Sequence, residues 1–262
     1  MTAVMNDTAT CPNTKMSAAS RSHYMAGNAT IDAANQLMDA MRKPDGTYRT
    51  FEEMAAEGIQ TRYLGHFDQM NRKLDAGLDP NTGEGERNAE FMYAVNVSLV
   101  EVDVATGKSQ VLRYSCAADV GVIGNKLAVD GQAYGGLSHS IGFALSEDYN
   151  AENKHGNMAG CGIPTVDMIP DDFNIIYTET PRLFGPHGSS GSSENFQCSG
   201  HMAVINAIQN ACGVRIYELP ATAAKVKAGY EKLQKGEDLT PPKYYLGTEF
   251  AEELDFIKAN PI

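Results

Sequence analysis

The sequence has few of the patterns that mark nucleic-acid-binding or membrane proteins. Lysine and arginine number 21 against 33 aspartate and glutamate residues, which gives a net charge of −12. Because phosphate neutralisation needs clustered cations, this balance argues against nucleic acid and anionic membrane surfaces as partners. No run of about 18 apolar residues occurs, and no apolar segment follows a basic start. We therefore expect a cytoplasmic protein without membrane spans.

Metal-ligand and hydrolase patterns are also missing. The five cysteines form no C-x-x-C pair, so the chain encodes neither iron–sulfur ligands nor a zinc ribbon. The six histidines show neither H-E-x-x-H nor H-x-x-x-H spacing, so no metal ligated directly by the protein is expected. The G-x-S-x-G elbow is absent too, which places a Ser–His–Asp hydrolase below the other interpretations.

The apolar spacing predicts an α+β fold of mixed strands and buried helices. Residues 91–104 and 109–120 are rich in Val and Tyr and flank a turn that contains glycine, which predicts a hairpin with a bulge near Leu99. Residues 172–179 predict a third strand. Helical spacing and end signals predict helices over residues 31–41, 50–58, 129–149, 201–212 and 220–236.

The length of 262 residues allows one large core or two small lobes. No internal repeat of 20 to 50 residues is visible. We expect a main domain over residues 1–236, followed by an extension over 237–262. The extension begins with a proline pair and continues as a short helix with apolar residues at Phe250, Leu254 and Ile257.

Two glycine-rich segments carry polar side chains that suit ligand binding. Residues 184–193 form a Gly/Ser-rich run that ends at Glu194, and such a backbone can take positive φ and approach an anionic group closely. A solvated linker with an exposed glutamate is the plainer alternative. Gln132 stands at the mouth of a glycine-rich helix, where its amide can donate and accept hydrogen bonds. The alternative there is a capping residue beside glycines needed for packing.

A third candidate is the small-residue loop over residues 17–22, whose sequence is SAASRS. Small side chains leave backbone N–H groups free to hold an anionic group, and Arg21 adds a positive charge. Loops of this composition are common, and a P-loop pattern is absent. The loop alone is therefore a weak signal.

The joint order of four motifs resembles the xanthine dehydrogenase and aldehyde oxidoreductase family of molybdenum hydroxylases. The likeness covers nearly all of residues 5–235 and is strongest to bacterial aldehyde oxidoreductases that carry molybdopterin cytosine dinucleotide. The motifs are, in order, CPN with SAASRS, the VEVDVATGK hairpin, DVG with NKLAVDGQAYGG, and GPHGSSGSSE followed by NAIQNACGVRIYELP.

The resemblance implies that residues 1–236 are the C-terminal portion of the molybdenum-cofactor-binding domain. It implies that Glu194 is the catalytic base, beside a molybdenum that the protein holds only through its pterin. Partial desolvation is the tuning expected of such a base. The resemblance leaves the role of Arg21 open. The cofactor-binding residues that it implies are Ala18, Ala19, Ser20, Ser22 and Gln132.

The implied activity is oxidation of an aldehyde or an aromatic N-heterocycle with oxygen derived from water. Electrons would leave through the pterin to iron–sulfur clusters, for which this chain has no ligands. We therefore expect a heteromeric complex with a second molybdopterin-binding chain and an iron–sulfur subunit, and with or without a flavin subunit that carries FAD. The alternative is a non-catalytic cofactor-binding or assembly subunit of such a complex.

The sequence departs from the family pattern at two places. Ser192 and Ser193 precede Glu194 where the family commonly has a glycine or a hydrophobic residue, and residues 195–197 follow where it has a proline. The glutamate of the family motif is kept, but the residues expected to form the pocket wall differ. The hydroxylase class is therefore a firmer inference than an aldehyde as the substrate. The family's iron–sulfur domain and earlier cofactor-binding segments have no counterpart here, which predicts a split gene or a fragment.

Overall fold

The computed structural model shows two compact units, each assembled from separate stretches of the chain. The first unit consists of residues 1–97, 113–140 and 171–201, and the second of 98–112, 141–170 and 202–262. Phe250, Leu254 and Ile257, on which the expected terminal helix is based, lie outside the described residues. The described residues are 2–4, 7–14, 16–68, 79–85, 90–150, 156–240, 252, 255–256 and 258–260.

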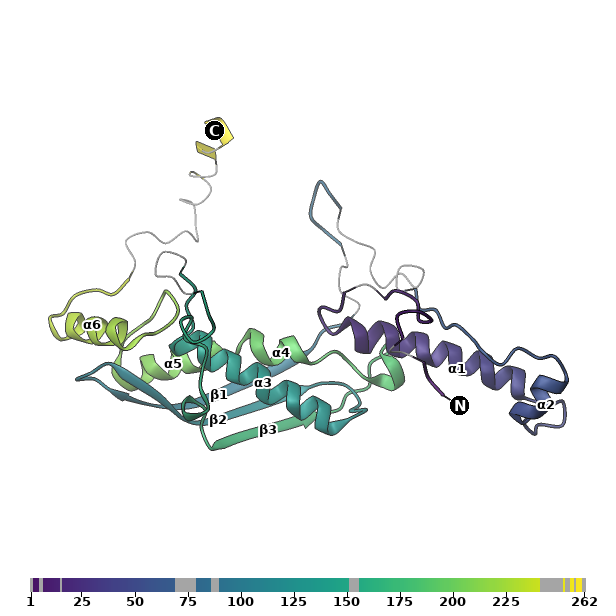
Figure 1. Cartoon of the computed structure of the whole chain (residues 1–262). Helices are drawn as coiled ribbons and strands as arrows, with labels where there is room; N and C mark the ends of the chain where they lie inside the picture. The colour runs from purple at the N-terminus through teal and green to yellow at the C-terminus, as the bar shows by residue number, and fades with distance from the viewer. Residues whose placement is uncertain are drawn as a thin grey trace. The chain divides into compact units, whose positions relative to one another are not determined.

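The first unit opens with a helical segment, which Figure 1 shows in purple. Helix α1 spans Gly27–Met41 and directly follows a π-helical turn, η1, at Ser22–Ala26. The predicted helix over 31–41 is confirmed, and it begins four residues earlier than its apolar spacing indicated. The turn after it includes Gly46 at a φ of +87°, a conformation that favours glycine.

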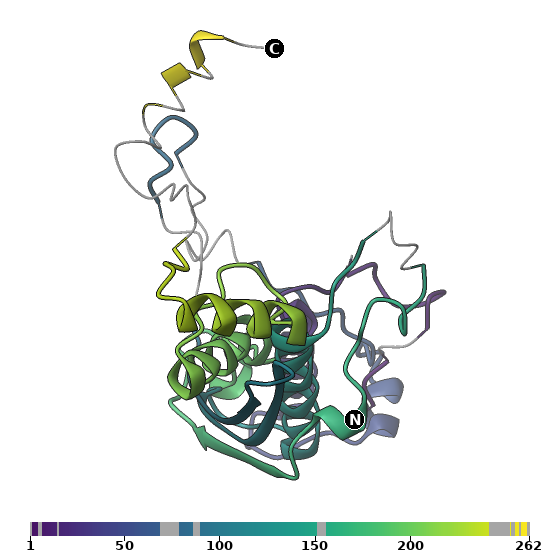
Figure 2. The same ribbon diagram turned by 90° about the vertical axis from the view of Figure 1, so that its left-hand side faces the viewer.

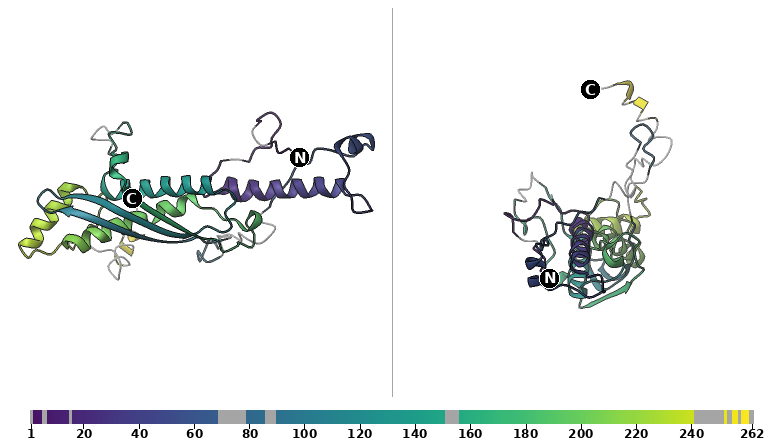
Figure 3. Two further views of the ribbon diagram at one scale, coloured as in Figure 1. Left: turned by 90° about the horizontal axis from the view of Figure 1, so that it is seen from below. Right: turned by 90° about the vertical axis from the view of Figure 1, so that its right-hand side faces the viewer.

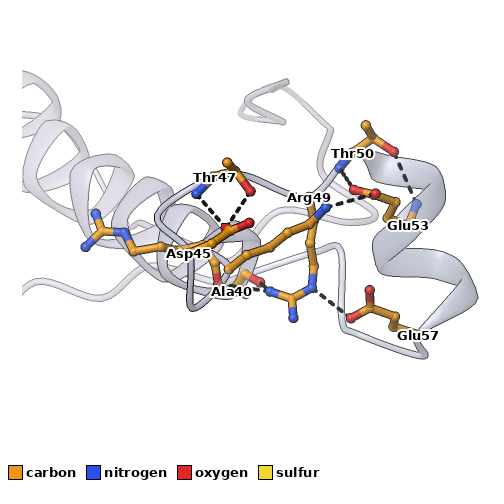
Figure 4. Close-up of polar contacts among 9 residues, drawn as sticks. Ala40, Asp45, Thr47, Arg49, Thr50, Glu53 and Glu57 are labelled. Atoms are coloured by element: carbon orange, nitrogen blue, oxygen red, sulfur yellow. Dashed lines mark hydrogen bonds and ion pairs between the residues drawn. The ribbon is translucent and has the colours of Figure 1, made fainter.

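A capping box starts the short helix α2, Phe51–Ala56, as the sequence predicts. Thr50 Oγ1 accepts a hydrogen bond from the Glu53 amide at 3.2 Å, and Glu53 Oε2 accepts one from the Thr50 amide at 2.8 Å (Figure 4). The two contacts satisfy two amides that the helix itself leaves without acceptors. Gly58, at a φ of +68°, follows the last turn.

The sheet has three strands in the order β1, β2, β3. The strands are β1 at Tyr93–Asp103, β2 at Lys108–Asp119 and β3 at Asp172–Thr178, which confirms the predicted hairpin and third strand. Strands β2 and β3 run parallel, with Arg113–Asp119 opposite Asp172–Thr178. Parallel neighbours need a long crossover, and helix α3, Lys126–Leu145, lies within it. The predicted α+β class is confirmed.

The predicted bulge near Leu99 is wrong. Burial alternates without a break along the whole of β1. The alternation shifts by one residue in β2 instead, where Leu112 and Arg113 are both exposed. Near Leu99 the apolar residues of the sequence change from odd-numbered to even-numbered positions. This change arises because β1 carries apolar side chains on its exposed face, and the strand contains no extra residue.

Aromatic side chains join the sheet of the first unit to the helices that cover one of its faces (Figure 1). Tyr114 stacks on Phe173 with ring centroids 5.4 Å apart, and Tyr134 of α3 lies 5.5 Å from the same Phe173. Tyr177 meets the ring of Phe196 edge to face at 6.5 Å. Phe196 belongs to helix α4, Ser193–Cys198, so this core contact fixes the helix that carries Glu194.

The second unit has its core around helix α5, Gly200–Cys212. Its buried face consists of Val204, Ile205 and Ile208, each at most 1% exposed. The helical spacing of the sequence over 201–212 predicts Met202 and Ala211 on the same inward face, which is wrong, since Met202 is 40% exposed and Ala211 is exposed. At 100° per residue, Met202 lies about a third of a turn from the centre of that face.

Helix α6, Ala223–Gln234, lies beside the end of α5 (Figure 2). Thr222 caps it by accepting from the Lys225 amide at 3.3 Å, and Gly236 at a φ of +75° follows its last turn. A Cβ at Gly229 would lie 2.6 Å from Val214 Cγ1, so only glycine allows this approach without a shift. The predicted helix over 220–236 is confirmed.

Candidate functional site

Glu194 lies in the first turn of α4, a six-residue helix that the sequence did not predict. The sequence placed this glutamate at the end of a loop, with the next helix starting near His201. Its N-cap is Ser192, and Ser193 and Glu194 open the first turn. This order of hydroxyl residues before an acidic one is typical of a helix start and was the signal available in the sequence.

The Gly/Ser-rich run before Glu194 is held against the Asp119-Val-Gly121 segment rather than solvated. The Val122 amide donates to the Gly188 carbonyl at 2.9 Å, and the Ser190 amide donates to the Val120 carbonyl at 3.2 Å. A Cβ at Gly121, whose φ is +66°, would lie 2.7 Å from the Gly188 oxygen. Ser189 and Ser190 are each 6% exposed. The solvated-linker alternative is therefore wrong for this run.

The loop over residues 17–22 reaches Glu194 across 174 positions of sequence. Ser20 Oγ accepts a hydrogen bond from the Ser192 amide at 3.1 Å and donates one to Glu194 Oε2 at 3.3 Å. A Cβ at Gly191 would lie 2.5 Å from Ser20 Cβ. His23 Nε2 also lies 2.6 Å from Ser189 Oγ, which makes a second link between the same two segments. The structure thus brings together two motifs that the sequence singled out separately.

Two backbone amides of this loop donate to acceptors within the loop itself. The Arg21 amide donates to the Ala18 carbonyl at 3.1 Å, and the Ser22 amide donates to Ser17 Oγ at 3.3 Å. The expectation that small side chains leave these N–H groups free is wrong for these two residues. Arg21 sends its Nη1 to the Thr14 carbonyl at 2.6 Å.

The loop nevertheless presents small side chains on the surface. Ala18, Ala19 and Ser22 are exposed, whereas Ser20 is half-buried. Ala19 and Ser20 have φ values of 50° and 57°, in the left-handed region that non-glycine residues rarely adopt. Backbone strain of this kind is common at ligand sites, where surrounding contacts hold it in place.

Glu194 is exposed, and its pKa is lowered from the usual value for a glutamate. The main cause is the Ser193 hydroxyl, which donates a hydrogen bond to Glu194 Oε2 at 2.7 Å and so favours the ionised form. Burial acts in the opposite direction and is the smaller influence, while the Ala19 amide and the Ser20 hydroxyl lower the pKa further. Within the described chain the hydrogen bonds outweigh burial, and the partial desolvation expected beside a bound cofactor stays a prediction.

Gln132 lies inside α3, the seventh residue from its start, rather than at its mouth. The residue is exposed, and no hydrogen bond joins its side chain to another described residue. Gly136 follows one turn later and packs on α4, since a Cβ there would lie 2.9 Å from Phe196 Cβ. Residues four apart share a helix face, so Gln132 stands one turn from the contact with the helix that carries Glu194.

The described part of the chain contains no group of three or more His, Cys, Asp or Glu side chains that could hold a metal ion. All five cysteines are free thiols. None of the helices in the described ranges is long and apolar enough to cross a membrane.

The sequence of residues 1–170 matches the family model of the molybdopterin cofactor-binding domain. The chain belongs to this family. It is a molybdenum hydroxylase family protein, as the resemblance implied. It is 43% identical over 220 residues to the aldehyde oxidoreductase of Megalodesulfovibrio gigas, an alignment that covers 84% of this chain and 24% of that protein. It is 37% identical over 161 residues to the nicotine 6-hydroxylase large subunit of Paenarthrobacter nicotinovorans, covering 58% of this chain and 20% of that one.

Solved structures show the same likeness. The aldehyde oxidoreductase from Desulfovibrio gigas matches with a TM-score of 0.81 at 42% identity, and that from Desulfovibrio desulfuricans with 0.79 at 45%. Each comparison covers 86% of this chain and 24% of the solved chain. The chain therefore spans about a quarter of the length of these aldehyde oxidoreductases.

Proposed function

We propose that this chain supplies the base and part of the cofactor-binding surface of a molybdenum hydroxylase, with Glu194 as the base. The observation that carries the proposal is the contact between Ser20 and Glu194, because it joins the loop expected to hold the cofactor to the carboxylate expected to act beside it. We place the cofactor-binding portion in residues 1–236 and treat 237–262 as an extension.

The residues present fit a molybdenum–pterin group held against an open surface. Glu194, Gln132, Ala18, Ala19 and Ser22 are all exposed, so a bound group can reach them without displacing core contacts. Added Cβ atoms at Gly131 and Gly135, which flank Gln132 on α3, would meet no atom within 4 Å. Glycines in such open positions allow a ligand to lie close to the helix backbone.

In this proposal, Gln132 and the loop residues Ala18, Ala19, Ser20 and Ser22 hold the pterin, in its cytosine dinucleotide form. When bound, the cofactor supplies a two-electron oxidation and passes the electrons on. Glu194 takes up the proton that the water-derived nucleophile loses, which requires it to be ionised before each turnover. The hydrogen bonds from Ser193 and Ser20 favour that ionised state.

We propose an aldehyde as the first substrate class to test and an aromatic N-heterocycle as the second. The name of the relative that covers 84% of this chain supports the first class. The name of the nicotine 6-hydroxylase subunit, which covers 58% of this chain, supports the second.

A Glu194→Gln variant of the complete complex tests the role of the base. It keeps the size of the side chain but cannot accept the proton, so turnover should fall by about 100-fold or more while molybdenum content is unchanged. Glu218→Gln is the matched control, because Glu218 is an exposed glutamate of the second unit. Wild-type turnover in a molybdenum-replete Glu194→Gln complex would favour the alternative, a non-catalytic cofactor-binding or assembly subunit.

We further propose that the chain works in a complex with a second molybdopterin-binding chain and an iron–sulfur subunit, with or without an FAD-carrying flavin subunit. The open face of the sheet in the first unit supports a large partner surface; Figure 3 shows this side from below. On it, the exposed fractions are 66% for Tyr93, 68% for Val95, 63% for Val97 and 56% for Ile176. Large apolar side chains exposed on one face of a sheet are typical of sites of protein association.

Copurification from the native source tests the complex. Chains with C-x-x-C iron–sulfur patterns should accompany this polypeptide, and Val97→Asp should abolish their recovery because it places a charge on the apolar face. Asn210→Asp is the control, since Asn210 is an exposed polar residue of helix α5 rather than of the sheet. Recovery of the wild-type chain as an isolated monomer would contradict the proposal.

A further inference from the structure

Two hydroxyl groups from distant segments meet at one oxygen of Glu194. Ser193 Oγ donates to Glu194 Oε2 at 2.7 Å, and Ser20 Oγ donates to the same oxygen at 3.3 Å. The two hydroxyl oxygens lie 3.4 Å apart. We propose that Ser20 and Ser193 are positioning residues that clamp Glu194 through its Oε2 atom, an inference that rests on the proposed role of Glu194.

Hydrogen-bond counting gives each hydroxyl a defined direction. A serine hydroxyl has one proton to donate and two lone pairs to accept. Ser20 Oγ already accepts from the Ser192 amide at 3.1 Å, which leaves its proton for Glu194 or for Ser193 Oγ. The Ser193 proton is committed to Glu194 by the shorter contact. Whichever of the two acceptors receives the Ser20 proton, Glu194 Oε2 is the final acceptor in the hydrogen-bond network of the two serine hydroxyls.

The backbone conformation around Ser20 places its hydroxyl next to Glu194. Ser20 and its neighbour Ala19 both adopt left-handed backbone conformations, which are unfavourable for non-glycine residues. Gly191 leaves the space that Ser20 enters, since a Cβ on it would lie 2.5 Å from Ser20 Cβ. The backbone conformation of Ser20 is unfavourable, and Gly191 provides the space that it needs. Both features indicate that the Ser20 side chain has a specific role.

Charged side chains on the neighbouring elements do not replace the two hydroxyls. Arg21 of the same loop donates to the Thr14 carbonyl. Lys126 and Asp130 of α3 pair with each other at 2.8 Å. The main causes of the shift in the pKa of Glu194 are hydrogen bonds and burial, and the Ser193 hydroxyl is the largest of them. The Ser193 hydroxyl is therefore the main group that favours the ionised carboxylate, and the Ser20 hydroxyl adds to it from the distant loop.

The clamp couples the loop over residues 17–22 to the carboxylate. Any ligand that shifts this loop moves Ser20 and therefore changes the hydrogen bonding of Glu194. In the proposed function, the loop that holds the cofactor is also the element that orients the base. Ser20 would then serve as the link between the two, rather than only as a ligand of the cofactor.

The test uses the complete complex with Ser193→Ala, Ser20→Ala and Ser193→Thr variants. Carbodiimides modify protonated carboxyl groups, so the pH profile of Glu194 modification, followed by peptide mass spectrometry, reports its protonation directly. The profile should move to higher pH in both alanine variants, further for Ser193→Ala because its contact is shorter. Ser193→Thr retains a hydroxyl and should restore the wild-type profile.

Ser192→Ala is the control, because the structure describes no hydrogen bond made by the Ser192 hydroxyl. Its modification profile should match the wild type. An unchanged profile in both Ser193→Ala and Ser20→Ala would overturn the clamp, even if Glu194→Gln is inactive. A shifted profile with full turnover in Glu194→Gln would leave the clamp standing and overturn the proposed base. The two proposals can therefore fail separately.

Discussion

Asp119 Oδ1 lies 3.2 Å from Arg182 Nη2, and the two side chains are only 17% and 11% exposed. The same Asp119 oxygen accepts hydrogen bonds from the Gly121 and Thr180 amides, each at 3.2 Å. Burial alone would raise the pKa of Asp119, but the hydrogen bonds from Thr180 and Gly121, together with the Arg182 charge, outweigh it and lower the pKa. Asp119 therefore joins the end of β2 to the segment that leads into the Gly/Ser-rich run.

The first prediction concerns acid stability. Because the folded pKa of Asp119 lies below its ordinary value of 3.8, its contribution to stability is present above that pH and is lost as the pH falls through the folded pKa. Asp119→Asn should lower the free energy of unfolding by about 1–3 kcal/mol at neutral pH and flatten the loss of stability in acid. Urea titrations from pH 3 to pH 7 measure both effects.

Asp172→Asn is the control for this prediction. Asp172 pairs with Arg113, and the two side chains are 49% and 61% exposed. The loss of free energy of unfolding in Asp172→Asn should therefore stay within about 1 kcal/mol. Equal effects of the two substitutions would contradict the role assigned to Asp119.

The second prediction concerns Gly191. Gly191→Ala places a Cβ 2.5 Å from Ser20 Cβ, so the loop over residues 17–22 or the Gly/Ser-rich run must shift. We expect a loss of about 1–3 kcal/mol in the free energy of unfolding. Gly124→Ala is the matched control, because its Cβ would meet nothing within 4 Å. Thermal melts of the two variants should separate clearly, and coincident melts would argue against close packing at Gly191.

The third prediction uses two adjacent glycines of α3. A Cβ at Gly135 meets open space, so Gly135→Ala should stabilise the helix by about 0.5–1 kcal/mol. A Cβ at Gly136 lies 2.9 Å from Phe196 Cβ and 3.2 Å from the Ser193 carbonyl oxygen, so Gly136→Ala should destabilise the fold and displace α4. Opposite changes in the denaturant midpoint are the expected result; changes of the same sign would contradict it.

The fourth prediction concerns the cap of α2. Thr50→Ala removes the acceptor for the Glu53 amide and should cost about 1 kcal/mol. Thr50→Ser keeps the acceptor and should remain within a few tenths of a kcal/mol of the wild type. Denaturant unfolding of both variants measures the difference. A Thr50→Ser loss as large as that of Thr50→Ala would show that the hydroxyl is not what the helix needs.

Much of the secondary structure follows from periodicity. Leu137, Ile141 and Ala144 of α3 are fully buried, as their helical spacing predicts. The capping box at Thr50 and the glycine after α2 also lie where local rules place them. These features depend on residues close together in sequence, for which short-range patterns carry the information.

The arrangement of the candidate site was not available from such patterns. Helix α4 has six residues, too few to show a helical period, so the position of Glu194 in its first turn was missed. The contact between Ser20 and Glu194 joins residues 174 positions apart. The importance of Ser193 depends on the rotamer that brings its hydroxyl to Glu194. The sequence motifs identified the segments that form the candidate site. The contact between those segments, from Ser20 to Glu194, is seen only in the tertiary structure.

The interleaving of the two units limits how this protein can change during evolution. The chain passes between the units five times, after residues 97, 112, 140, 170 and 201. Four of those passages fall inside β1, β2, α3 and α5, so no single cut in the gene separates one unit from the other. Neither unit can be exchanged as a cassette by recombination. Changes in this region would therefore have to arise by point substitution within the segment or by replacement of the segment as a whole.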